Sequence, residues 1–118
     1  MIRFMHCVKA QAGVSETDFR EAFTGQRMKD LASQIAEATG AISYKLRLTL
    51  KIELNIGLME ERGGAEPFDG IMEMWWESGS GLLEFKESDE FRKLQDEMTT
   101  YQETFVDFSR SSRFFIED

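Results

Sequence analysis

Residues 68–77 read Phe-Asp-Gly-Ile-Met-Glu-Met-Trp-Trp-Glu, and this stretch decides the fold. Its side chains alternate between two sets, which are Met72, Met74 and Trp76 on one side and Ile71, Glu73 and Trp75 on the other. A period of two predicts a β-strand. Both sets are largely apolar, so we expect both faces of this strand to be covered.

Three more stretches are predicted to be strands. Residues 2–9 are short, apolar and free of Gly and Pro, and residues 112–117 form the last strand. Residues 42–58 carry the longest alternation, with apolar side chains at every even position. Because a typical strand has only about 5–6 residues, we expect this run either to reach a neighbouring chain or to bend at residues 55–57. A polar loop follows at residues 60–67.

Two helical regions separate these strands. The first runs from Ser15 to Thr39, where apolar side chains recur at helical spacing. Gly25 falls inside it, which predicts a kink or a close contact at that position. The second region covers residues 78–86 and 89–98, and an irregular segment then leads to the last strand.

The resulting order of elements is β-α-β-β-α-β. It predicts an α+β, ferredoxin-like fold with a four-stranded antiparallel sheet and two helices on one face. The other face of the sheet is also apolar and needs a cover. A second copy of the same sheet is the simplest cover, so we expect a homodimer in the form of a dimeric α+β barrel, with a lumen between the two sheets. Residues 1–118 are expected to form one such domain.

Composition disfavours several classes of function. The 118 residues carry a formal net charge of −8, which argues against a nucleic-acid partner. One Cys and one His are too few for a disulfide framework or a multi-histidine metal site, and no phosphate-binding loop or dinucleotide fingerprint occurs, so we expect no metal and no cofactor. No apolar run reaches the ~18 residues of a membrane helix, and the first residues lack a signal-peptide pattern. We therefore expect no membrane partner and a cytoplasmic location.

Two motifs carry a family resemblance. They are Asp-Gly-Ile-Met-Glu-Met-Trp at residues 69–75 and Phe-Val-Asp-Phe-Ser-Arg-Ser at residues 105–111, shortly before Phe114 and Phe115. At this separation they resemble the EthD family, a branch of the dimeric α+β barrel proteins related in fold to antibiotic-biosynthesis monooxygenases. The resemblance implies that fold and a homodimer. Relatives in fold act as cofactor-free oxygenases, cyclases, dehydratases or isomerases on aromatic or lactone substrates.

Two residues are candidates for acid–base chemistry. His6 is the only side chain whose ordinary pKa lies near neutrality. In an apolar cavity it would be a general base, and elsewhere a packed, hydrogen-bonded residue. Glu73 interrupts an apolar strand; facing the lumen it would be a second acid or base, and beside a cation such as Arg47 it would be half of a structural ion pair. We expect Cys7 to be inert packing.

Four side chains are candidates for substrate binding. Trp75 and Tyr44 would stack on a flat substrate, or alternatively pack in the core or the dimer interface. Arg27 and Arg47 would hold a carboxylate or phenolate through paired hydrogen bonds, or alternatively form ion pairs at the surface or the interface.

Three hypotheses of function stay open at this point. In the first, the chain binds a small apolar or aromatic metabolite in the lumen between the sheets. As an enzyme of a degradation or secondary-metabolism pathway, it would then catalyse cofactor-free proton transfer or oxygenation, with His6 or Glu73 as the base. In the second, it is a non-catalytic accessory or binding protein of the same fold. In the third, it is a haem-binding barrel in which His6 is the only imidazole ligand.

Overall fold

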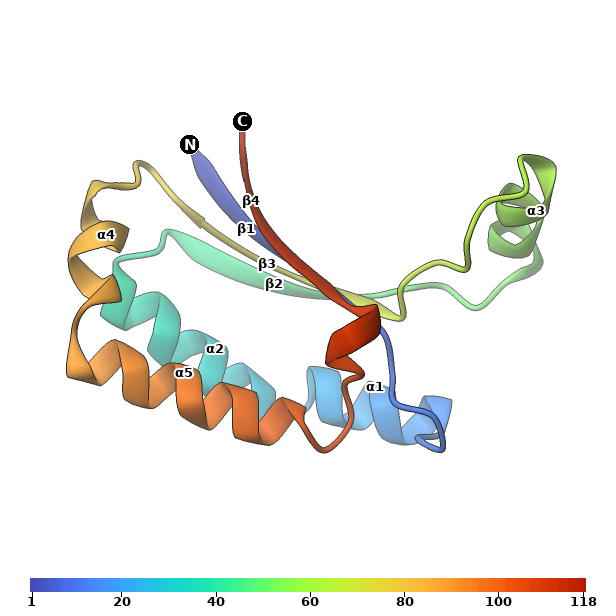
Figure 1. Ribbon diagram of the computed structural model, residues 1–118, viewed down its shortest axis with the longest axis horizontal. Coiled ribbons are helices and arrows are strands. Elements are labelled where there is room, and N and C mark those ends of the chain that lie inside the picture. Colours follow the sequence, from blue (N-terminus) through green and yellow to red (C-terminus); the bar gives the residue numbers. More distant parts are fainter.

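Strands β1 and β3 form the central pair of a four-stranded antiparallel sheet, and helices line one face of that sheet (Figure 1). The computed structural model describes residues 1–118. The strands are β1 (Ile2–Val8), β2 (Ser43–Leu48), β3 (Gly70–Trp76) and β4 (Ser112–Glu117), in the order β2-β3-β1-β4. The helices are α1 (Glu16–Thr24), α2 (Gln26–Thr39), α3 (Glu53–Glu61), α4 (Ser80–Lys86), α5 (Asp89–Gln102) and the short 3-10 helix η1 (Phe108–Arg110). This arrangement confirms the ferredoxin-like α+β fold.

The register of the strands separates two faces of the sheet. His6 on β1 lies opposite Met72 on β3 and Arg113 on β4. Directly opposite residues project to the same side of a sheet, so these three share the face that packs against the helices, which we call the inner face. The inner face also carries Phe4, Val8, Met74, Trp76 and Phe115. The outer face carries Met5, Cys7, Glu73, Trp75, Phe114 and Ile116.

The core lies between the inner face and the helices. Phe23 of α1 and Met28 and Leu31 of α2 are completely buried there, against Val8 and Met74 of the sheet. Burying a side chain of this size stabilises the fold by about 1.5–3 kcal/mol. The core therefore fixes how α1 and α2 lie on the sheet.

Gly25 divides the first helical region into two helices. Its backbone is extended, with φ −76° and ψ 177°, and a Cβ at this position would strike the carbonyl oxygen of Glu21. Only glycine fits such a close approach. The kink predicted at Gly25 is thus a complete break between α1 and α2.

The prediction of one long strand over residues 42–58 is wrong. Strand β2 ends at Leu48, which lies opposite Gly70, the first residue of β3. Continuing the same register would bring Lys51 opposite Pro67, which has no N–H to donate to a strand neighbour. Without a partner strand, the backbone satisfies its own hydrogen bonds by forming α3.

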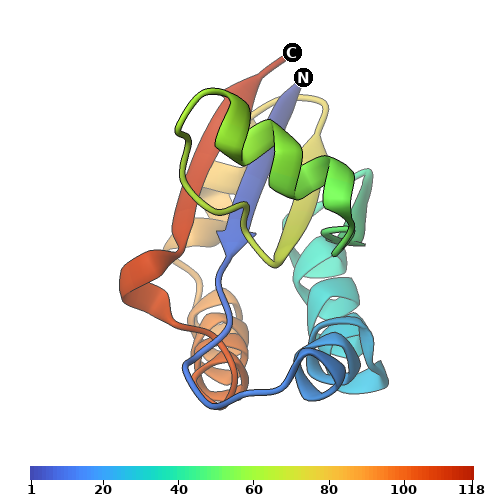
Figure 2. The ribbon, with the colours of Figure 1, turned by 90° about the vertical axis from the view of Figure 1, so that its right-hand side faces the viewer.

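Helix α3 stands off the end of the sheet, away from the other helices (Figures 1 and 2). None of its residues is buried, and the even-numbered apolar side chains that suggested a strand are exposed. These side chains are Leu50, Ile52, Leu54, Ile56 and Leu58. No helix of the structure is long and apolar enough to cross a membrane.

Helix α5 continues past its predicted end at Met98 and stops at Gln102. Ser88 caps its first turn, since the hydroxyl accepts a hydrogen bond from the Phe91 N–H at 3.1 Å. The additional turn, in a segment that the sequence predicts to be irregular, brings Gln102 against the sheet, where it is buried.

Candidate functional site

A cavity of about 500 Å³ lies between the inner face and helices α2, α4 and α5. Its apolar end is lined by Ile35, Trp76, Leu82, Phe91 and Phe115. Its polar end is lined by His6, Thr99, Gln102 and Arg113. Helix α5 runs along its length, with Phe91 in the first turn and Gln102 as the last residue. The volume suits a small organic molecule, since ligand pockets usually measure about 300–1,000 Å³.

A second cavity, of about 180 Å³, touches the polar end of the first. The two cavities share His6, Thr99, Gln102 and Arg113, and the smaller one extends to Phe108 and Ser111 beside η1. These four shared residues come from β1, α5 and β4, and we call them the polar cluster. The polar cluster is thus the place where both cavities meet.

His6 is the buried base of the polar cluster. It is 4% exposed, and neither ring nitrogen makes a hydrogen bond within the chain. Burial, together with the smaller effect of the positive charge of Arg113, lowers the pKa of His6 to about 4. At neutral pH the imidazole is therefore uncharged and has a free nitrogen that can accept a proton.

Gln102 presents a buried amide that has no partner. The residue is 4% exposed, and its Nε2 atom makes no hydrogen bond. Its main-chain carbonyl is occupied, because it accepts hydrogen bonds from the N–H groups of Phe105 and Val106 at 3.1 and 2.8 Å. An unpaired buried donor costs about 1–3 kcal/mol, so its position facing the cavity marks a place for an acceptor.

Arg113 supplies the positive charge of the polar cluster. It lies on the edge strand β4, is exposed, and forms no ion pair with any carboxylate of the chain. Asp96 is the only carboxylate that lines the large cavity, and it too makes no ion pair. The guanidinium is therefore free to bind an acid group from outside the chain.

Comparison with solved structures identifies the fold. An EthD family protein from Bacillus halodurans C-125 superposes with a TM-score of 0.63 at 14% identity, covering 100% of this chain and 98% of that one. A protein from Arabidopsis thaliana gives 0.61 at 11% identity, with coverage of 100% and 95%. SnoaB from Streptomyces nogalater, described as a cofactor-independent oxygenase and solved as a point mutant, gives 0.58 at 8% identity, with coverage of 99% and 91%. The chain has an EthD-like fold.

The likeness is one of fold alone, since each of these identities is far below the level at which function transfers. No family model matches the sequence, and no curated protein matches it either. The EthD-like fold predicted from residues 69–75 and 105–111 is confirmed at this level.

The structure does not bring Glu73 and His6 together. Glu73 lies on the outer face of the EthD-like sheet, where its Oε2 atom lies 3.4 Å from Nε of Arg47. Trp75 is on the same face, and the guanidinium of Arg3 lies 4.9 Å from the centre of its ring. The register therefore places His6 on one face of the sheet, and Glu73 and Trp75 on the other. Glu73 forms the structural ion pair with Arg47 that was its alternative role.

Arg27 and Tyr44 also lie outside the large cavity. Arg27 is on the surface between α2 and α5, where it faces Glu97 at 3.9 Å across a wide hollow lined almost entirely by charged and polar groups. Tyr44 projects from the inner face of β2, but its hydroxyl is 2.9 Å from the Ser33 hydroxyl and donates to the Lys29 carbonyl at 3.2 Å. Both side chains are thus engaged with α2 or α5.

Three members of the polar cluster were not predicted from the sequence. Thr99 and Gln102 fall in a segment that looked irregular, and their place on one face of α5 becomes visible only once the helix is known to reach residue 102. Arg113 was visible as a cation in a strand, but its place beside His6 depends on the register of β1 with β4. No motif in the sequence carries that register.

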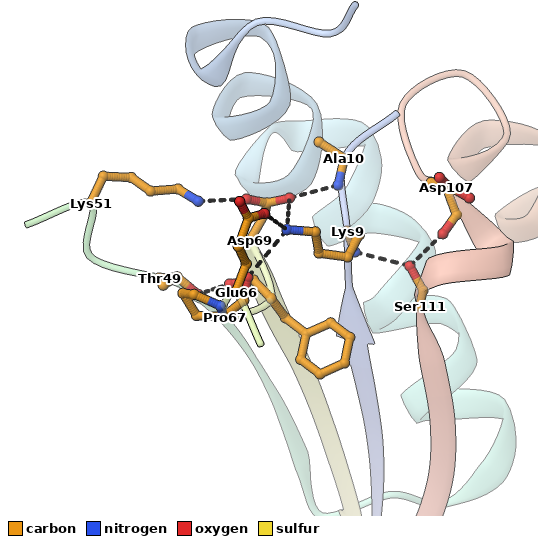
Figure 3. Close-up of polar contacts among 10 residues, drawn as sticks. Lys9, Ala10, Thr49, Lys51, Glu66, Pro67, Asp69, Asp107 and Ser111 are labelled. Atoms are coloured by element: carbon orange, nitrogen blue, oxygen red, sulfur yellow. Dashed lines mark hydrogen bonds and ion pairs between the residues drawn. The ribbon is translucent and has the colours of Figure 1, made fainter. Parts of the chain in front are cut away.

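A polar clamp, made of Lys9, Ala10, Lys51 and Asp69, holds the end of β1 that follows His6 (Figure 3). The Asp69 carboxylate accepts hydrogen bonds from the Ala10 N–H at 2.7 Å and from Lys51 Nζ at 2.5 Å, and Lys9 Nζ lies at 4.0 Å. Burial alone would raise the pKa of Asp69, but these donors and charges outweigh it and hold that pKa below its usual value. The clamp therefore ties β1 to the start of β3.

A second contact ties β1 to β4. The Lys9 N–H donates to the Ser111 hydroxyl at 2.9 Å, and that hydroxyl donates to the Asp107 carbonyl at 2.7 Å (Figure 3). Ser111 stands two residues before Arg113. This contact therefore fixes the strand that carries Arg113 against the strand that carries His6.

The lowered pKa of His6 predicts a pH dependence of stability. Between pH 6.5 and 4 the unfolded chain protonates His6 and the folded chain does not, so the free energy of unfolding falls with pH by about 3 kcal/mol over that window. Arg113 and Asp96 are the charged groups that line the same cavity, and both remain in a His6→Gln variant. Urea denaturation at pH 7 and pH 5 measures how much the free energy of unfolding falls between the two pH values. We expect this fall to be about 2 kcal/mol larger in the wild type than in His6→Gln. Equal losses would contradict a buried, neutral His6.

Proposed function

We propose that the cavity beside the polar cluster binds a small, largely apolar or aromatic molecule, and that His6 removes a proton from it without a cofactor. The observation that carries this proposal is the state of His6. The imidazole is buried, uncharged at neutral pH and free of hydrogen bonds, at the end of a cavity whose other walls are mostly apolar. A base in such a place acts on an acidic C–H or O–H group that the apolar walls have positioned.

The ligand would then lie between the sheet and the helices of one chain, and not in a lumen between two sheets. The cavity of about 500 Å³ lies there, and His6 lines it. SnoaB, which shares the fold, is described as a cofactor-independent oxygenase. In the oxidative version of our proposal, His6 takes a proton from a CH2 group of the substrate, and dioxygen, which is the oxidant, forms a C–O bond with the resulting carbanion. The peroxide takes a proton back, and the O–O bond then breaks with loss of water to leave a carbonyl group.

A non-catalytic binding protein is the second candidate, and one observation favours it. In acid–base sites another group commonly orients the base through a hydrogen bond. Here no residue of the chain makes a hydrogen bond to either nitrogen of the His6 ring, and Glu73 is on the opposite face of the sheet. A loosely held imidazole is compatible with a pocket that only binds its ligand.

The two candidates can be separated with 5-nitrobenzisoxazole, a flat aromatic probe with an acidic C–H group. A base that removes this proton opens the N–O bond and releases a coloured phenolate. We expect the wild type to accelerate the opening at least tenfold over His6→Gln, since positioned bases contribute about 10²–10⁴-fold. Glu73→Gln is the matched control and should retain the wild-type rate, because Glu73 is on the outer face. Equal rates in the wild type and His6→Gln would leave the binding protein as the function.

We also propose that two copies pack their outer faces together in a homodimer. Phe114 and Ile116 are 43% and 39% exposed on this face, beside Met5 and Trp75. Exposed apolar side chains gathered on one face of a sheet mark an interface. Solved proteins of this fold, such as the EthD family protein from Bacillus halodurans, share the sheet that would form it.

Sedimentation velocity at micromolar concentration tests the homodimer. We expect the wild type to sediment as a dimer and Ile116→Asp as a monomer, because packing of the outer faces would bury the new carboxylate. The residue opposite it, Arg3, already pairs with Asp118. Leu83→Asp is the matched control, since Leu83 is 70% exposed on α4, which does not belong to the outer face. A monomeric wild type, or an Ile116→Asp variant that stays dimeric, would refute this interface.

A further inference from the structure

The polar cluster contains two hydrogen-bond donors that nothing in the chain uses. Gln102 Nε2 is buried and unpartnered, and the Arg113 guanidinium has no carboxylate partner. Both residues line the large and the small cavity, next to His6. A buried amide donor and a free cation lie together at one end of a cavity whose lining is mostly apolar, and they indicate the kind of group that binds there.

An anionic oxygen satisfies both donors at once. It would accept a charge-assisted hydrogen bond from Arg113 and a second one from the Gln102 amide. A neutral apolar molecule would leave the Gln102 amide unpaired, at the cost that an unsatisfied buried donor carries. Water would satisfy the amide, but it would not use the apolar walls formed by Trp76 and Phe115.

We infer that the ligand is a small organic anion, with an apolar or aromatic body in the large cavity and one anionic oxygen group, a carboxylate or a phenolate, held by Arg113 and Gln102. This inference rests on the proposed function and names the ligand class of the same site. His6 lines the same end of the cavity as these two donors, so it is placed to act on a proton of the atoms next to the anionic group.

The geometry also links binding to the basicity of His6. The positive charge of Arg113 is one of the two causes that lower the pKa of His6. An anion bound to Arg113 offsets that charge, so a bound ligand makes His6 a stronger base. Arg113 and Gln102 are binding residues in this scheme, and His6 is the group that reacts.

A pair of probes that differ only in charge tests the inference. 2-Naphthoate carries a carboxylate on an aromatic body, and 2-naphthamide carries a neutral amide on the same body. We expect isothermal titration calorimetry to show that the wild type binds naphthoate at least tenfold more tightly than naphthamide. The reason is that charge-assisted hydrogen bonds are stronger than neutral ones. The NMR signals of the single histidine should shift on binding, which places the probe in the cavity.

Variants of the two donors should remove this preference. Arg113→Gln removes the cation from an exposed position on a strand. Gln102→Glu keeps the size of the side chain but replaces its donor with a carboxylate. Both variants should bind naphthoate no more tightly than naphthamide. Arg62→Gln is the matched control, because Arg62 is exposed and forms no ion pair. This substitution changes the net charge by the same amount as Arg113→Gln. It should retain the preference.

The outcomes separate this inference from the proposed function. Equal binding of both probes by the wild type, with shifts at His6, would overturn the organic anion as the ligand class and leave the apolar cavity as a binding site. Loss of the preference in Arg62→Gln as well would also overturn it, since the effect would then come from net charge. Failure of both probes to bind would overturn the inference and the proposed binding site together.

Discussion

The register of β1 against its two neighbours is the constraint on which the site depends. It sets His6 opposite Met72 and Arg113, on the side of the sheet that faces α5. A slip of one residue would turn every side chain of the strand to the other face, and Cys7 would then take the place of His6. The contacts of Asp69 with Ala10, and of Ser111 with Lys9, oppose such a slip at the end of the strand.

Burial then determines the chemistry of the side chains that the register gathers. The same apolar surroundings that keep His6 uncharged leave the Gln102 amide without a protein partner. An unsatisfied buried amide costs free energy in the empty protein. An uncharged His6 does so only below about pH 6.5, where the unfolded chain takes up a proton that the folded chain does not. A ligand that fills the cavity and accepts hydrogen bonds from Gln102 and Arg113 would recover part of that cost. The cavity and the unsatisfied groups that line it would therefore serve the same ligand. Under the proposed function, stability and ligand binding are coupled at this site.

Much of the fold could be predicted because alternation and helical spacing are local signals. The apolar strand at residues 70–76, the capped helices and the break at Gly25 all leave such signals. The alternation over residues 49–58 misled the prediction, because a strand also needs a partner for its backbone, and Pro67 prevents β3 from supplying one. The candidate site was harder to predict. Both sets of β3 side chains are largely apolar, so the sequence does not indicate which set faces the helices. Glu73 and His6 therefore looked equally suitable as the base.

The titration of His6 is the most direct test of a buried, uncharged base in a cavity that takes an anion. His6 is the only histidine, so its ring protons and carbons give one set of NMR signals that can be followed against pH without ambiguity. We expect the free protein to titrate with a midpoint of about pH 4, and the midpoint to rise when 2-naphthoate is bound. A midpoint near 6.5 in the free protein, unchanged by naphthoate, would contradict both the burial of His6 and its link to Arg113.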